Sequence, residues 1–303
     1  MAREPTERPY IPAVLLSDAA LALMRDVFGQ PDLLSDSPRI ARRTVAWGGD
    51  PVVLEHRAIV VSEATLLAAL PMPATAGAAS AADLIIEAAP SARLPPPHRF
   101  GSRRALAAEV HLKGTANTAS CWIEALEAGW LFLVSGTDSA GWLLGVGGGF
   151  ETLLAGSRLI APLIADVRAH SGSFDACPRI ATALQSEDWL LCGTAAIAFD
   201  PICGDGVAQA MREAILASAV VIGMAEGADH EQLRSHYQSM LIASMRRHLK
   251  LCADFYRSGG DGPWWDAELR ALVEGYEWCS GQLAGVPEPR YQLNGFRLVA
   301  REG

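Results

Sequence analysis

"LLCGTAAIAFDPICGDGVAQAMREAILAS", residues 190–218, is the stretch of sequence that decides the fold. An apolar run ends at Gly193, small residues follow, and Pro201 fixes a turn before Gly204 and Gly206. The apolar residues then recur with helical spacing, which predicts a buried strand, a tight turn and a long helix. The first N–H groups of such a helix have no partner inside it and carry the positive end of its dipole. The segment is therefore suited to lie along a flat, partly anionic ligand.

The composition predicts a globular protein with one large or two small domains. The chain has 303 residues, of which 50% are hydrophobic and 19% charged. Its net charge of −9 argues against nucleic acid or an anionic membrane as the main partner, because phosphate binding needs clustered lysine and arginine. We find neither a secretory signal nor an apolar run of membrane-spanning length, so we expect a cytoplasmic protein with no membrane span.

The six cysteines form no CxxC pair, and the histidines form no visible cluster. Two of the histidines, His230 and His236, are six residues apart rather than four, so they could not both bind one zinc from a helix. We therefore expect reduced thiols and no metal site.

Hydrophobic periodicity and turn residues on either side of the opening stretch predict a mixture of helices and strands. The expected helices cover 17–29, 62–70, 151–167 with a kink near Pro162, 206–224, 229–258 and 263–284. The expected strands cover 42–62 with a turn at 48–50, a short buried segment at 82–89, an antiparallel block over 103–148, and 188–193. This order predicts an α/β protein whose chain visits two layers or domains more than once.

The motif in the opening stretch resembles the second flavin-contact motif of the FAD-dependent aromatic hydroxylases and their relatives, the tryptophan halogenases and geranylgeranyl reductases. The pattern there is G-D-A-A-x-x-x-D/x-P-x-x-G-x-G followed by a helix, and the likeness covers roughly residues 12–260. The resemblance implies FAD, with NADH or NADPH as the reductant, and a helix N-terminus that faces the pyrimidine edge of the flavin. The implied cofactor-binding residues are Gly193, Thr194, Ala195, Asp200, Pro201, Gly204, Asp205 and Gly206.

The resemblance also implies a fold class and a division into domains. The fold is an FAD/NAD(P)-binding-type three-layer α/β fold, shortened at its N-terminus, with an antiparallel substrate-domain sheet and a C-terminal helical region. Residues 1–41 would hold the helix that follows a missing dinucleotide unit, and 227–303 the C-terminal helices. The substrate-type domain would comprise 42–62 and 100–185, and the residual FAD-type domain 63–99 and 186–226.

Three departures from the family pattern bear directly on the cofactor. The N-terminal strand–GxGxxG–helix is absent, and the near match "LLGVGGGFETLL" at 143–154 has Phe150 where the last small residue should stand. Thr194 replaces the aspartate of the G-D pair, which leaves one hydroxyl to bond the ribityl chain. Glu63 stands where the family has an arginine, and its charge would repel a pyrophosphate.

Two functions compete on these grounds. In the first, the chain is an FAD-dependent oxidoreductase, monooxygenase-like, whose apolar or aromatic substrate lies against Trp130, Phe132 and Trp142 of the antiparallel block. In the second, it is a flavin-free homologue that acts as a binding or partner protein. A third reading is an interaction module with Trp264, Trp265 and Trp278 as anchors. No residue is assigned as a catalytic acid or base.

Overall fold

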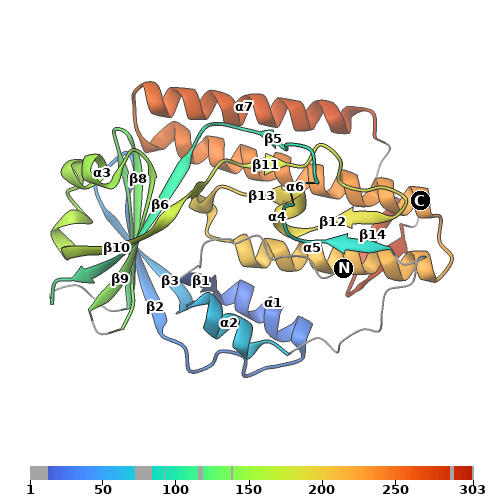
Figure 1. Cartoon of the computed structure of the whole chain (residues 1–303), viewed down its shortest axis with the longest axis horizontal. Helices are drawn as coiled ribbons and strands as arrows, with labels where there is room; N and C mark the ends of the chain where they lie inside the picture. The colour runs from blue at the N-terminus through green and yellow to red at the C-terminus, as the bar shows by residue number, and fades with distance from the viewer. Residues whose placement is uncertain are drawn as a thin grey trace. The chain divides into compact units, whose positions relative to one another are not determined.

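The computed structural model describes residues 13–71, 84–91, 93–114, 119–137, 139–286 and 290–301. These residues divide into two compact units, each assembled from three chain segments (Figure 1). Unit 1 takes the described parts of Met1–Pro71, Gly101–Ala176 and Ala253–Arg270. Unit 2 takes the described parts of Met72–Phe100, Cys177–Cys252 and Ala271–Gly303.

Unit 1 contains an eight-stranded sheet in the order β1-β3-β2-β7-β8-β9-β6-β10. All neighbouring strands are antiparallel except β2 and β7, which run parallel, so the predicted antiparallel block is confirmed. The strands are β1 (Val14–Ser17), β2 (Arg39–Ala46), β3 (Val52–Val61), β6 (Arg104–Leu112), β7 (Ser120–Leu126), β8 (Gly129–Ser135), β9 (Ala140–Gly147) and β10 (Ile164–Asp175).

Side chains that alternate along the strands of this sheet build a core on each face. On one face Leu131 and Leu133 of β8 pack with Phe150 and Leu153 of helix α3 (Phe150–Gly156). On the other face the adjacent Val134 belongs to a second buried cluster with Ile40, Val60 and Cys121.

Two helices of unit 1 begin and end as their sequences predict. α1 (Asp18–Phe28) is capped by Ser17, whose hydroxyl accepts from the amide of Ala20, and it ends at Gly29 with φ 62°. α2 (Glu63–Ala69) is capped in the same way by Ser62, which accepts from the amide of Thr65 at 3.0 Å.

The predicted helix over 151–167 is wrong beyond residue 156. After α3 the chain makes a short 3-10 turn, η1 (Ala161–Leu163), and then enters β10, which contains Asp166. The cause is Glu124 of β7, a buried carboxylate that accepts hydrogen bonds from three successive amides. These are the amides of Arg158, Leu159 and Ile160, at 2.8, 2.9 and 3.0 Å. Amides bound to a carboxylate outside their own segment are not available to continue a helix.

An aromatic cluster fills another part of unit 1. It consists of Trp47, Trp130, Tyr256, Trp264 and Trp265, whose rings meet edge-to-face or tilted at centroid distances from 4.9 to 6.3 Å. Two of its buried indoles are anchored by hydrogen bonds: Trp130 Nε1 donates to Tyr256 OH at 3.1 Å and Trp265 Nε1 donates to the carbonyl of Leu126 at 2.8 Å. Trp265 is buried and therefore packs within the chain.

Unit 2 combines short sheets with long helices. Its strands are β4 (Ile85–Glu87) parallel to β12 (Trp189–Leu191), the antiparallel set β5 (His98–Arg99), β11 (Arg179–Ile180) and β13 (Ile197–Ala198), and the hairpin β14 (Tyr291–Asn294) with β15 (Arg297–Ala300). Its helices include α4 (Gly193–Ala196), the 3-10 turn η2 (Pro201–Cys203) and α5 (Gly206–Ala225). Helices α6 (His230–Gly259) and α7 (Pro263–Ala284) supply residues to both units.

Two predictions for unit 2 need correction. The segment at 82–89, of which 82–83 lie outside the described residues, does form strand β4, but β4 is not buried, since Ile85 is 60% exposed. The C-terminal region 227–303 is not all helix, because it ends in the β14–β15 hairpin. The hairpin strands are too short, and too exposed, to show a clear alternation in the sequence.

Helix α5 is the one helix among the described residues that is long and apolar enough to cross a membrane. Half of its most apolar window is buried inside the protein, as in the core helix of a globular domain.

Candidate flavin-contact site

The site predicted from the opening stretch begins where β12 ends. Gly193 has φ 55°, a left-handed conformation that favours glycine, and a side chain there would approach the carbonyl oxygen of Ala88 at 3.2 Å. Gly193 and the next three residues form the single turn of α4, in which Thr194 is exposed while Ala195 is buried. The small residues therefore let the chain reverse closely against the end of β4.

The turn from Asp200 to Gly204 is braced by local hydrogen bonds. Asp200 is buried, and its Oδ1 accepts from the amide of Ile202 at 2.9 Å. Pro201 opens the 3-10 turn η2, and Gly204 closes it with φ 61° while donating to the carbonyl of Pro201 at 3.0 Å. This aspartate therefore shapes the turn, and the order Asp, Pro, Gly has a local reason.

The N-terminus of α5 follows this turn and is open. Asp205 occupies the N-cap position but makes no side-chain cap hydrogen bond; its carboxylate pairs with Arg212 instead. Gly204 and Gly206 are exposed, and a methyl group on either would meet nothing within 4 Å. The first amides of this twenty-residue helix have no acceptor four residues earlier within the helix, and the two glycines leave space beside them, so they can stabilise an electron-rich ligand edge.

Glu213 lies on the buried face of α5, and the sequence analysis missed it. Burial raises the pKa of its carboxyl to about 7, while hydrogen bonding from Gln209 and from the Gly193 amide acts in the opposite direction. Its Oε1 accepts from Gln209 Nε2 at 3.1 Å, and the same Nε2 lies 3.1 Å from Ser244 Oγ. The signal that could have found Glu213 is the i, i+4 spacing of Gln209 and Glu213 on an otherwise apolar helix face.

Burial also affects Cys192, the residue just before the glycine turn. It raises the pKa of this thiol to about 11, and the neighbouring charge of Glu213 adds to the effect. Tyr237 closes the same region by donating its hydroxyl to the carbonyl of Leu191 at 2.6 Å. The groups that these contacts place beneath the glycine turn are Cys192, Glu213 and Tyr237, and none of the three is a cation.

The three aromatic residues predicted as substrate walls all lie in unit 1, but in different surroundings. Trp130 is 1% exposed and packs inside the aromatic cluster, so it is a core residue. Phe132 and Trp142 are half-buried and pack at the margin of the cluster around Val134.

A cationic group accompanies Phe132 on this face of the sheet. The guanidinium carbon of Arg43 lies 6.0 Å from the centre of the Phe132 ring, and Nη2 of Arg43 lies 2.9 Å from Nε2 of His56. Burial, and secondly the charge of Arg43, lower the pKa of His56, which favours the neutral imidazole that can accept this hydrogen bond. The sequence analysis did not single out either residue, because β2 and β3 bring them together.

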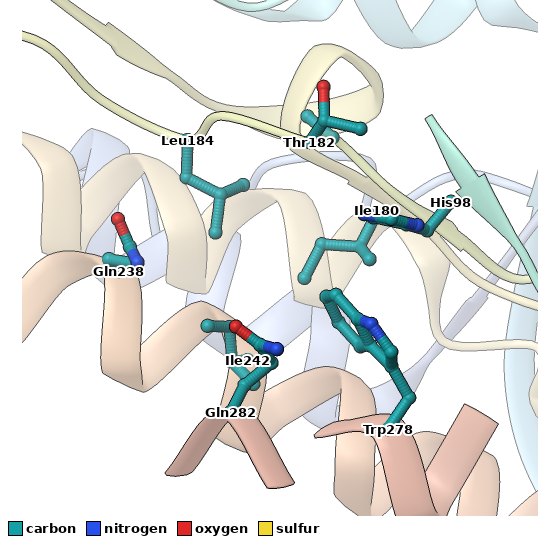
Figure 2. A pocket seen from close by; sticks show the side chains of 9 residues that line it. His98, Ile180, Thr182, Leu184, Gln238, Ile242, Trp278 and Gln282 are labelled. Atoms are coloured by element: carbon teal, nitrogen blue, oxygen red, sulfur yellow. The ribbon is translucent and has the colours of Figure 1, made fainter. Parts of the chain in front are cut away.

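Unit 2 also contains a cavity of about 310 Å³ that is separate from the predicted flavin-contact residues but includes Trp278, one of the predicted anchors (Figure 2). Gln238 and Leu184 lie at one end of this cavity, and His98 and Trp278 at the other, with the two ring centroids 4.6 Å apart. None of the residues assigned to the flavin-contact motif lines it.

The architecture as a whole is the fold of FAD-dependent monooxygenases and halogenases: a mixed α/β chain with a large mixed sheet and a helical C-terminal region. Three solved structures illustrate the likeness. QhpG, a peptidyl tryptophan dihydroxylase essential for tryptophylquinone cofactor biogenesis, matches 97% of this chain and 79% of its own, with a TM-score of 0.69 and 16% identity.

The other two structures are halogenases. CmlS, a flavin-dependent halogenase, gives a TM-score of 0.68 at 14% identity. The match covers 89% of this chain and 64% of CmlS. The myxobacterial chondrochloren halogenase CndH, a variant of FAD-dependent halogenases, gives a TM-score of 0.65 at 14% identity. The match covers 96% of this chain and 85% of CndH. No family model and no curated protein sequence matches the chain. At sequence identities this low, the likeness to these structures shows a shared fold alone.

Proposed function

We propose that this chain is an FAD-dependent oxidoreductase, monooxygenase-like, that acts on an apolar or aromatic substrate. The observation that supports this most strongly is the open N-terminus of α5 behind a braced glycine turn, in a chain with the fold of flavin-dependent halogenases and hydroxylases. FAD, reduced by NADH or NADPH, would supply the redox and oxygen chemistry, as cofactors do in such enzymes.

The residues of unit 2 would bind and orient the flavin. Gly204 and Gly206 leave room for a ring to approach the backbone, and the first amides of α5 would donate to its electron-rich edge. The exposed hydroxyl of Thr194 can donate or accept one hydrogen bond to a polyol chain. Asp200 and Pro201 would act by holding the turn in shape.

The residues of unit 1 suggest the kind of substrate. Phe132 and Trp142 offer half-buried aromatic surface, and Arg43 adds a half-buried cation to the same face. The Nε atom of Arg43 is buried and has no hydrogen-bond partner among the described residues. A cation in this setting favours an aromatic substrate that carries a carboxylate or phenolate group.

The second candidate, a flavin-free binding or partner protein, is favoured by a carboxylate at the motif itself and by departures from the family pattern. Asp205 places a carboxylate at the open helix end, although Arg212 neutralises it in part. Glu63 replaces an arginine of the family pattern, and Thr194 an aspartate. The two candidates differ in one measurable property, which is retention of FAD.

The test is to incubate the purified chain with FAD, remove free cofactor by gel filtration and record the visible absorbance spectrum. We expect wild-type protein to keep the two absorbance bands of bound flavin. Gly206→Val should lose them, because its side chain would fill the space at the helix end, while the free energy of unfolding changes by less than about 1 kcal/mol. Gly281→Val, at an exposed glycine of α7 with equally open surroundings, is the matched control and should retain flavin.

A wild-type chain that elutes colourless at saturating FAD would contradict the proposal and favour the flavin-free candidate. If flavin is retained, the same preparation can be screened with aromatic acids and their neutral amides. Tighter binding of the acids would support the role given to Arg43. Equal binding of acids and amides would show that Arg43 does not select a charged substrate.

A further inference from the structure

A second chemical cluster lies beside the glycine turn and has no part in the function proposed above. Cys203, from η2, faces His248 and Cys252, which stand one turn apart on α6. The two sulfur atoms are 3.8 Å apart, and Sγ of Cys252 lies 3.3 Å from Nε2 of His248. All three residues belong to unit 2, and their ligand atoms lie within 4.8 Å of one another.

These distances resemble the edges of a zinc site, but the histidine argues against a metal. Tetrahedral bond lengths of about 2.3 Å for Zn–S and 2.0 Å for Zn–N give edges of about 3.8 and 3.5 Å. However, Nε2 of His248 accepts a hydrogen bond from the amide of Asp200 at 2.8 Å. A neutral imidazole has only one acceptor nitrogen, so a metal at Nε2 would have to displace this amide.

The stacking of His248 makes such a displacement harder. Its ring lies on that of Phe199 at 4.0 Å between centroids, with only 5° between the planes. The imidazole is thus fixed in position by a stacked ring and by a backbone donor. The cluster is better suited to thiol chemistry, in which His248 stays where it is.

We propose that Cys203 and Cys252 form a dithiol site that peroxides oxidise reversibly to a disulfide. The sulfur atoms are already close to van der Waals contact, and side-chain rotation would have to bring them to the bond length of about 2.05 Å. Cys203 is half-buried and can be reached from solvent, whereas Cys252 is buried. Cys203 is therefore the first thiol to react and Cys252 the resolving thiol.

The reaction balances as follows for hydrogen peroxide. The Cys203 thiolate attacks one peroxide oxygen, the O–O bond breaks, and the departing hydroxide takes a proton to become water, which leaves a sulfenic acid on Cys203. Cys252 releases its thiol proton as its sulfur attacks Sγ of Cys203. The S–O bond then breaks, and the hydroxide takes up that proton and leaves as a second water. The two sulfurs lose two electrons in total, and a dithiol reductant returns them.

The test uses the full-length protein, treated with hydrogen peroxide or with dithiothreitol, then alkylated and digested with trypsin without reduction. Cys252 falls in the peptide 251–257, and Cys203 in 180–212 together with Cys192. We expect the oxidised sample to contain these two peptides joined, with the loss of two hydrogen atoms, and the reduced sample to contain both alkylated. Fragmentation of the joined species should place the bond at Cys203.

The variants separate the possible pairs. Cys203→Ser should abolish the joined species, whereas Cys192→Ser should keep it. Oxidation of both cysteines with no joined peptide would overturn the proposal. It would also be overturned by stoichiometric zinc in the purified protein that protects both thiols from alkylation. Neither result depends on whether the chain binds FAD.

Discussion

Glu213 occupies a buried position on α5 at which an ionised carboxylate is costly. Its pKa is raised from 4.5 to about 7, so between these values the folded protein holds a proton that the unfolded chain has released. The free energy of unfolding should therefore fall as pH rises through this window, by up to ~3 kcal/mol in total.

Glu213→Gln should remove this pH dependence, because the amide keeps the hydrogen-bonding shape without the charge. We expect the variant to be more stable than wild type at pH 8 and close to it at pH 4.5, as measured by urea unfolding. Glu187→Gln, at an exposed position, is the control and should follow wild type at both pH values. A wild-type protein whose stability is flat between these values would show that Glu213 is not protonated in the fold.

At the scale of residues, the sequence revealed those features whose causes are local. The order of Asp200, Pro201 and Gly204 specifies a turn through bonds between residues at most three positions apart. The sequence did not reveal the contact between Cys203 and Cys252, which are 49 residues apart. That proximity exists only because α6 packs beside the turn, and no local pattern encodes it.

Among the elements, the segment that follows α3 depends on Glu124. Glu124→Ala would leave the amides of Arg158 and Leu159 without this acceptor and that of Ile160 with Ser157 Oγ alone, and we expect a loss of about 2–4 kcal/mol in the free energy of unfolding. Glu127→Ala, on an exposed residue close by, should cost less than about 0.5 kcal/mol. Chemical denaturation of both variants provides the measurement, and equal costs would refute the role assigned to Glu124.

The carboxylate of Glu124 also explains why the helix prediction over 151–167 was wrong. The apolar residues of this segment do have helical spacing, but spacing reports only which side chains can share a face. Glu124 lies about thirty residues earlier and changes the partners of the backbone amides. By contrast, α1 and α2 carry their own caps at Ser17 and Ser62, and the sequence predicted both correctly.

For the whole molecule, the discontinuous course of the chain has consequences for truncation. Residues 253–270 supply Tyr256 and Trp265 to the core of unit 1, together with Glu268, whose carboxylate lies 2.7 Å from the buried guanidinium of Arg103. A chain that ends at residue 252 should therefore lose soluble expression, because it leaves this buried cation without its ion-pair partner and opens the aromatic cluster.

A chain that ends at residue 286 keeps all three segments of unit 1 and is the matched comparison. It should remain soluble and resist limited proteolysis within unit 1. Equal solubility of the two truncated chains would show that residues 253–270 are dispensable for unit 1.

The sequence predicted the α/β class, the antiparallel block and the long helices at 206–224, 229–258 and 263–284, since each repeats its own period over many residues. It did not predict that β1 would join the edge of the large sheet beside β3. A strand of four residues is too short to display a period, and its place is set by its partner.

The aromatic cluster of unit 1 gives the protein an optical property of its own. Four indoles and a phenol are held at fixed angles and short separations, so their electronic transitions couple and should produce paired circular dichroism bands of opposite sign. Such a couplet requires the rings to keep their mutual orientation and disappears when they rotate independently. The packing of unit 1 can thus be followed without any label, through light absorbed by the residues that hold it together.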